Sequence, residues 1–121
     1  MVIYLYGPDD WRREEKKKEI IKEFRNKHSN LGLDYFDFAN EEEPSRFEDF
    51  VKSQSLFEAA KLAVVYGLED PSKEFIGELK PLADDDSRTV LISGASAPPK
   101  SLGKKVLTQK LETLHDIAKE L

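Results

Sequence analysis

The chain has 121 residues and a formal net charge of -5, and it contains no cysteine. The lack of cysteine excludes a disulfide framework, a thiolate metal site and a cysteine nucleophile; it suits the reducing cytosol, so we expect a cytoplasmic protein. The acidic balance argues against direct nucleic acid binding, because domains that hold duplexes by their phosphates are usually basic. The length predicts a single domain over residues 1–121.

The chain opens with an apolar run followed by a charged helical segment. Val2–Tyr6 ends at Gly7-Pro8, which predicts a buried strand and a turn. This run has no basic flank and is too short to span a membrane, so we expect neither a signal peptide nor a membrane partner. Asp9 or Asp10 can cap the helix that follows, which extends from Trp11 to about Lys27 with its first turns exposed.

The next elements repeat this alternation. Leu33–Phe38 has the composition of a strand. Ser45 is placed to cap a short helix that ends near Gln54, with Glu48 as its capping-box partner. The continuous apolar run Lys61–Tyr66 predicts a central strand that is buried on both faces of a parallel sheet.

The remaining elements are a helix, a strand and a tail. Pro71 suits the first turn of a helix that extends to Leu82. Thr89–Ile92 predicts a fourth buried strand. The tail, about residues 100–121, has apolar residues at helical spacing and predicts one or two amphipathic helices. These apolar residues are Val106, Leu107, Leu111, Leu114, Ile117, Ala118 and Leu121.

The alternation of strands and helices predicts a three-layer α/β domain with a mostly parallel sheet flanked by helices. In such folds ligands bind outside the carboxyl ends of the strands. The segments to search are therefore Gly7–Trp11, Ala39–Ser45, Gly67–Pro71 and Ser93–Lys100.

The first of these segments is where a nucleotide-binding domain places its phosphate loop. The sequence from Gly7 onward has one glycine and no Gly-Lys-Ser/Thr ending, and Asp9 and Asp10 would repel a polyphosphate. We interpret Arg12 and Arg13 as solvated arginines on an exposed helical turn. We therefore expect no ATP binding or hydrolysis by this chain.

Other catalytic or metal-binding patterns are also missing. His28 and His115 lack partners at ligand spacing, and Ser96 lacks the second glycine of a nucleophile elbow. The triplet Asp84–Asp86 is interpreted as a solvated turn, because consecutive carboxylates rarely converge on one ion. We expect no catalytic residue, no cofactor and no metal, and hence a protein that is not an enzyme.

One segment between the second helix and the central strand indicates a binding role. Leu56 and Phe57 are adjacent large apolar residues among small and polar ones. Adjacent side chains point in different directions, so at least one of the pair is expected to face outward and could anchor a partner. The alternative is that both residues turn under the sheet and pack against Val64 or Phe50.

Four stretches, in this order and with this spacing, resemble the N-terminal domain of the delta subunit of bacterial DNA polymerase III, a component of the clamp loader. The resemblance covers residues 2 to about 107. The matching stretches are Tyr4–Asp10, Tyr35–Phe38, Ser55–Phe57 with Lys61–Tyr66, and Asp86–Ile92.

The resemblance implies a P-loop-like AAA+ core that has lost its phosphate loop. It also implies an accessory role in DNA replication, in which Leu56 and Phe57 enter a pocket on the sliding clamp and help to open it without ATP hydrolysis. Ser55 and Gln54 are then flanking contacts. Two features depart from the family. Gln54 lies three residues before Phe57, and the family's subunit continues into a second small domain and a helical collar that joins the other clamp-loader subunits.

Two other functions compete with this one. A phosphoacceptor domain of the response-regulator kind has paired acids after its first strand, as Asp9 and Asp10 are here, but it also needs an aspartate at the end of its third strand. This chain has Tyr66–Glu69 at that place. Direct DNA binding is disfavoured by the net charge and by the Leu and Val residues interleaved with the candidate lysines. These are Lys100, Lys104, Lys105 and Lys110.

Overall fold

The structure is a computed structural model that describes residues 1–28, 32–53, 60–103 and 106–111. It contains a five-stranded, all-parallel sheet with the order β2-β3-β4-β1-β5. The strands are β1 Val2–Tyr6, β2 Leu33–Asp37, β3 Lys61–Tyr66, β4 Arg88–Gly94 and β5 Leu107–Lys110. The helices are α1 Asp10–Lys27, α2 Glu43–Lys52, α3 Lys73–Leu82 and the short 3₁₀ helix η2 Lys100–Leu102.

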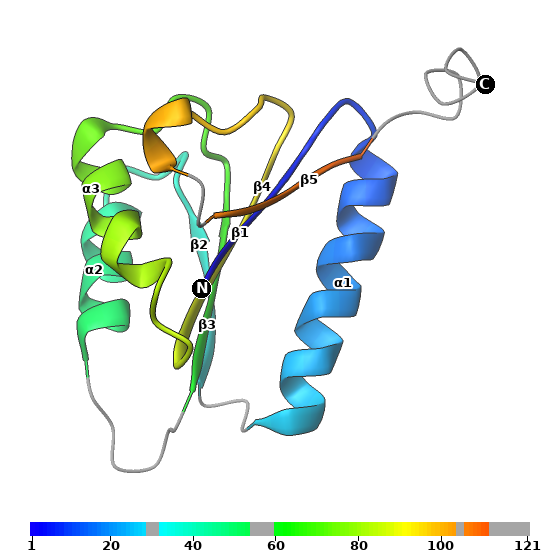
Figure 1. Cartoon of the computed structure of the whole chain (residues 1–121). Coiled ribbons are helices and arrows are strands. Elements are labelled where there is room, and N and C mark those ends of the chain that lie inside the picture. The colour runs from blue at the N-terminus through cyan, green and yellow to red at the C-terminus, as the bar shows by residue number, and fades with distance from the viewer. Residues whose placement is uncertain (29–31, 54–59, 104–105, 112–121) are drawn as a thin grey trace.

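The helices lie on both faces of the sheet, as the α/β pattern predicts. From β1 the chain crosses to β2 at the far edge, and the steps to β3, β4 and finally β5 go in the opposite direction. Crossovers between parallel strands are right-handed, so this reversal places α1 on one face and α2, α3 and η2 on the other. Figure 1 shows the two groups of helices on opposite sides of the sheet. The prediction of a three-layer α/β fold with a mostly parallel sheet is thus confirmed.

The central strand β3 is apolar throughout because it meets a core on each face. Ala63 and Val65 belong to the core under α2 and α3, whereas Leu62 and Val64 belong to the core under α1. Alternate side chains of a strand point to opposite faces, so a strand covered on both sides needs a continuous apolar run.

The helix starts agree with the sequence at α1 and differ at α2 and α3. Asp9 caps α1, as predicted, and its carboxylate accepts a hydrogen bond from the backbone N–H of Arg12 at 3.0 Å. The cap predicted at Ser45 is wrong. Helix α2 begins earlier and holds Pro44 in its first turn, where a missing N–H costs no helical hydrogen bond. Ser72, not Pro71, precedes α3, and the Ser72 hydroxyl accepts from the N–H of Phe75 at 3.1 Å.

The helical tail predicted for about residues 100–121 is wrong where the structure describes it. Lys100–Leu102 is a single 3₁₀ turn, and Leu107–Lys110 is the edge strand β5, which pairs with β1. This pairing satisfies backbone groups along one side of β1 that a helix would leave without partners. Val106 and Leu111, five residues apart on an extended chain, point to opposite faces and enter the two cores. Residues 112–121 lie outside the described residues.

Within the described ranges, no helix combines the length and the apolar character needed to cross a membrane.

Candidate functional site

The predicted clamp-binding residues Gln54, Ser55, Leu56 and Phe57 lie outside the described residues. The residues on either side of them are described and are joined by Lys61. Its Nζ donates hydrogen bonds to the backbone oxygen of Phe50 at 2.8 Å, to Oγ of Ser53 at 2.6 Å and to the backbone oxygen of Ser53. The end of α2 and the start of β3 are thus held together at the edge where the strands begin.

Lys61 is a buried cation, with only 6% of its surface exposed. Its ammonium lies among the carbonyls at the carboxyl end of α2, which carry partial negative charge and lack helical partners. The ammonium also lies 5.2 Å from the centre of the Phe50 ring. Sequence reasoning counted Lys61 as part of an apolar run and missed this role. The one sequence indication was a lone lysine at the start of a buried strand, shortly after a helix end.

The loop between β1 and α1 is closed by the chain's own groups. The N–H of Asp9 donates to the backbone oxygen of Leu111 at 3.4 Å, and the N–H of Leu111 donates to the backbone oxygen of Tyr6 at 2.6 Å. The Asp9 carboxylate accepts from the N–H of Arg12, the kind of donor that binds phosphate at a helix N-terminus. Gly7 has φ +119, and a Cβ there would overlap the Leu111 oxygen. The end of β5 therefore lies where a phosphate loop needs open space.

Arg13 is not solvated, so that interpretation is wrong: its side chain is 11% exposed. Its Nε donates to the backbone oxygen of Gly7 at 3.0 Å, and its Nη1 donates to Oγ of Ser93 at 3.3 Å. It also pairs with Asp10. The first turns of α1 lie beside the ends of β1 and β4, so this long side chain folds back and ties the helix to both strands.

A cavity of about 320 Å³ lies at the carboxyl edge of the sheet and is lined by Arg13, Lys17, Tyr66 and Ser93, among others. This is the edge where α/β folds bind ligands. Lys17 pairs with Glu14 at 2.8 Å, and Arg13 pairs with Asp10. Both cations of the cavity are therefore balanced by neighbouring carboxylates.

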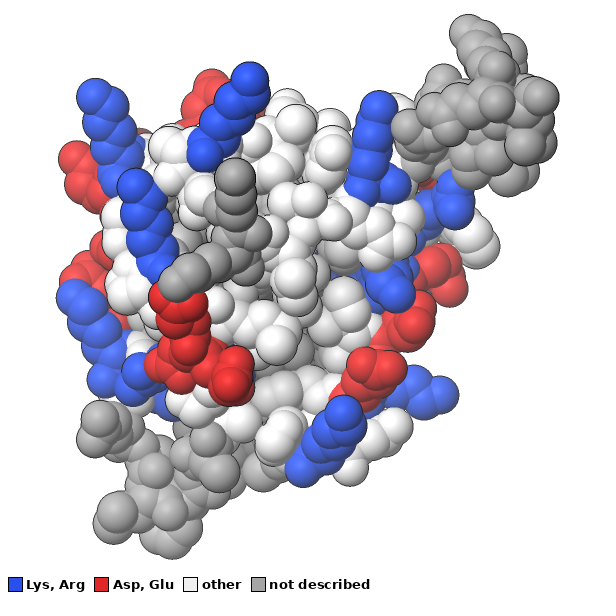
Figure 2. All heavy atoms as spheres, viewed as in Figure 1, with Lys and Arg blue, Asp and Glu red and all other residues white. Residues whose placement is uncertain are grey.

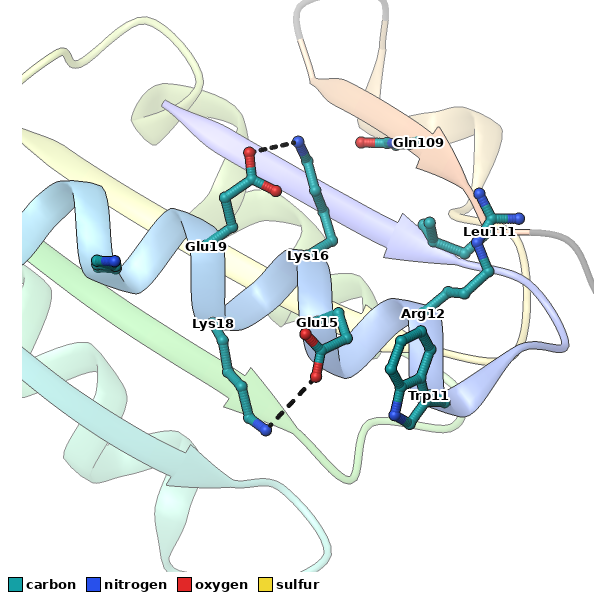
Figure 3. Close-up of a pocket in the computed structure, with 9 residues that line it drawn as sticks. Trp11, Arg12, Glu15, Lys16, Lys18, Glu19, Gln109 and Leu111 are labelled. Carbon is teal, nitrogen blue, oxygen red and sulfur yellow. Dashed lines mark hydrogen bonds and ion pairs between the residues drawn. The ribbon is translucent and has the colours of Figure 1, made fainter.

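A second hollow, of about 510 Å³, lies between the outer face of α1 and the end of β5 (Figure 3). Trp11 stands at its rim with 71% of its surface exposed. Lys16 pairs with Glu19 at 3.5 Å, and Lys18 pairs with Glu15 at 3.7 Å. In Figure 2 positive and negative side chains are intermingled, and the face in view presents no continuous positive area. Such a surface lacks the basic stripe typical of nucleic acid binding.

The acidic turn Asp84–Asp86 serves local structure. The Asp85 carboxylate accepts from the N–H and the hydroxyl of Ser87 at 2.9 and 2.7 Å, and it pairs with Arg88 at 2.8 Å. The hydrogen bonds from Ser87, with those from Arg88, lower the pKa of Asp85. In the part of the chain that the structure describes, no three His, Cys, Asp or Glu residues are grouped so that they could hold a metal ion.

No protein-family model matches this chain, and a search of curated proteins finds no match either.

Proposed function

We propose that this chain is a non-catalytic, cytoplasmic accessory module of DNA replication, of the clamp-loader delta type. It docks on the DNA polymerase sliding clamp through Leu56 and Phe57, with Ser55 and Gln54 as flanking contacts, and helps to open the clamp without hydrolysing ATP. Other clamp-loader subunits are partners if further domains accompany this one. The module makes no direct contact with nucleic acid.

The closed loop between β1 and α1 carries this proposal. In the observed sheet β1 lies between β4 and β5, the arrangement expected of a P-loop-like AAA+ core. In such a core the loop after β1 would hold phosphates. Here Asp9 and Leu111 occupy its backbone donors, as described above. This strand order, together with a β1–α1 loop whose backbone donors are already bound within the chain, supports a role in binding a partner rather than in nucleotide hydrolysis.

The contacts of Lys61 give further support. Lys61 follows the 54–59 segment in the chain, and it binds Phe50 and Ser53, which precede that segment. A docking segment whose ends are already fixed loses less conformational entropy on binding than one with free ends. The base of the proposed docking element is thus preorganised.

The sheet order disfavours the response-regulator alternative. Response regulators have the order 2-1-3-4-5, in which the first and third strands are neighbours. Here β4 separates β1 from β3. Asp9 is used as a helix cap and Asp10 is paired with Arg13, so both acids already have partners within the chain.

The test is a binding assay of the Leu56→Ala/Phe57→Ala double variant with the purified sliding clamp of the same organism. We expect the variant to keep the parent's circular dichroism and Tm and to lose on the order of a hundredfold or more in affinity, because a pair of hot-spot residues dominates such an interface. Trp11→Ala, which removes an exposed aromatic residue elsewhere, is the matched control and should bind normally.

Two outcomes would refute the proposal. A folded double variant that binds the clamp as well as the parent removes Leu56 and Phe57 from the interface. A double variant that unfolds assigns the pair to the core, since truncating two buried side chains costs about as much as the whole stability of a domain of this size.

A further inference from the structure

A groove of about 510 Å³ is lined largely by residues of α2 and α3. These two helices lie on the face of the sheet opposite α1 (Figure 1). Its lining includes the apolar residues Val51, Pro81 and Leu82, together with Gly77. Val51 and Leu82 belong to the core and leave only 6% and 8% of their surface exposed. Both also line the groove. Val51 and Leu82 take no part in the contacts described above for the Lys61 side chain or for the β1–α1 loop.

The groove opens where α3 lacks a side chain. In the first halves of the two helices the rings of Phe47 and Phe75 pack edge to face with centres 5.3 Å apart. Further along α3 comes Gly77, and a Cβ at that position would meet no atom within 4 Å. Gly77 is exposed, and a side chain at this position would therefore enter open space.

Neither backbone geometry nor packing requires a glycine at position 77. Gly77 lies in the middle of α3, and it is not among the described glycines with positive φ, which are Gly7, Gly67 and Gly103. A glycine in a helix interior is less stable than alanine at the same place. The fold thus carries a destabilising residue where it opens a groove, which is the arrangement that lets a partner's side chain approach the helix backbone.

The rim of the groove is acidic. Two of its carboxylates are balanced by neighbours, because Glu48 pairs with Lys52 and Asp85 pairs with Arg88. Glu74 and Glu78 also lie at the rim. Burial raises the pKa of Glu78 and the nearby charge of Glu48 adds to this, whereas Lys52 partly opposes it. A cation brought to this rim would relieve the electrostatic cost of keeping Glu78 ionised.

We propose that the groove binds a basic amphipathic helix of a partner protein. An apolar side chain of that helix fits over Gly77, against Val51 and Leu82, and its lysines or arginines lie beside Glu74 and Glu78. A helix laid in a groove presents both kinds of side chain at spacings of three and four residues, which suits an apolar lining with a charged rim. This proposal does not depend on the clamp-binding proposal.

The experiment is an NMR titration of the isotope-labelled full chain with two synthetic peptides of 16 residues. Both have leucines at i, i+4 and i+7; one has lysines at the flanking positions and the other has glutamates there. We expect the basic peptide to shift the amide signals of Val51, Gly77 and Leu82, with an affinity that falls as salt is raised. The acidic peptide should leave these signals unchanged.

Three variants separate recognition from folding. Gly77→Leu fills the groove and should lower the affinity for the basic peptide at least tenfold while the protein stays folded. Lys80→Leu, which adds the same side chain at an exposed position of α3 outside the groove, should bind normally. Gly77→Ala should raise Tm by a few degrees, because no backbone or steric demand opposes it.

Several outcomes would overturn the proposal. These are the absence of shifts with both peptides, equal shifts with both, or undiminished binding by Gly77→Leu. Shifts at the same residues that depend on protein concentration without peptide, together with dimers in sedimentation, would identify the occupant as a second copy of this chain and would likewise refute a separate partner helix.

Discussion

The Nζ of Lys61 lies 2.6 Å from Oγ of Ser53, so the first residue of β3 holds the residue that follows α2. The two residues are eight positions apart along the chain, and the proposed docking segment lies between them in the sequence. The contact is partly buried, and the ammonium donates hydrogen bonds to the backbone oxygens of Phe50 and Ser53 as well as to the Ser53 hydroxyl. It couples the stability of the core to the positions of Phe50 and Ser53.

Lys61→Met is expected to lower the free energy of unfolding by about 1–3 kcal/mol, because it leaves the carbonyls of Phe50 and Ser53 without their donor in a poorly solvated place. Urea denaturation of the variant measures this loss. Lys52→Met is the control, since it removes an exposed ion pair with Glu48, and such pairs contribute little to stability. Equal losses in the two variants would show that the burial of Lys61 adds nothing to stability.

Three of the four strands that sequence reasoning found, β1, β3 and β4, are mostly buried, whereas in β2 only Phe36 is buried. Val64 and Leu91 are fully buried, and the apolar runs that contain them are local features that can be recognised in the sequence. Strand β5 has no such run: its four side chains, Leu107 among them, are exposed, and only backbone pairing with β1 defines it. Pairing with a partner about a hundred residues away along the chain leaves no local pattern, and the helical spacing of the tail was therefore misleading.

The contacts of Lys61 and Arg13 were missed for a related reason. Each is a long charged side chain whose partners are fixed by the fold: Arg13 reaches Ser93, 80 positions along the chain. A charged residue is usually exposed to solvent. Arg13 instead binds other parts of the chain, because α1 lies over the carboxyl ends of β1 and β4. The Asp9 cap, by contrast, was predictable, because a helix cap depends only on residues next to it.

Gly7→Ala is expected to destabilise the protein more than Gly103→Ala. Both glycines have positive φ, +119 and +87, so each substitution carries a backbone cost of about 1–2 kcal/mol. A Cβ at Gly103 meets nothing within 4 Å, whereas one at Gly7 would also lie 2.9 Å from the backbone nitrogen of Leu111. Chemical denaturation gives the two losses, and amide hydrogen exchange should show faster exchange in β5 of Gly7→Ala. Equal stability of the two variants would mean that the contact with Leu111 carries no cost.

Glu78 and Asp85 should respond to pH in opposite senses. Burial raises the pKa of Glu78 above its ordinary value of 4.5, so ionising Glu78 opposes folding. The loss of stability appears as pH rises from 4.5 through the higher pKa of the folded state. Glu78→Gln should therefore be more stable than the parent at pH 7, with no advantage below about pH 4.

Hydrogen bonds from Ser87 lower the pKa of Asp85 in the folded protein. The ionised Asp85 carboxylate therefore stabilises the fold above its ordinary pKa of 3.8, and this stabilisation is lost as pH falls through the lower pKa of the folded state. Asp85→Asn should be less stable at pH 7, and the deficit should shrink in acid. Parallel pH dependences in thermal unfolding would contradict both assignments.

The β1–α1 loop is expected to bind no nucleotide. The N–H of Asp9 is bound to Leu111 and that of Arg12 to the Asp9 carboxylate, and the Arg13 guanidinium is bound to Gly7, Ser93 and Asp10. A triphosphate would have to displace these contacts and then lie beside two carboxylates, where like charges repel it. Calorimetry with Mg²⁺ and ATP should therefore give no saturable heat.

Asp9→Asn and Asp10→Asn provide a sharper form of the same test. If charge repulsion alone excluded ATP, the double variant would bind it, since asparagine still caps a helix well. We expect no binding by the double variant either, because Leu111 and the end of β5 still fill the space beside Gly7. Micromolar ATP binding by the double variant alone would show that the loop opens and that only its charge excludes nucleotides. Micromolar binding by the parent chain would overturn the account of the closed loop and, with it, the non-catalytic function proposed for the chain.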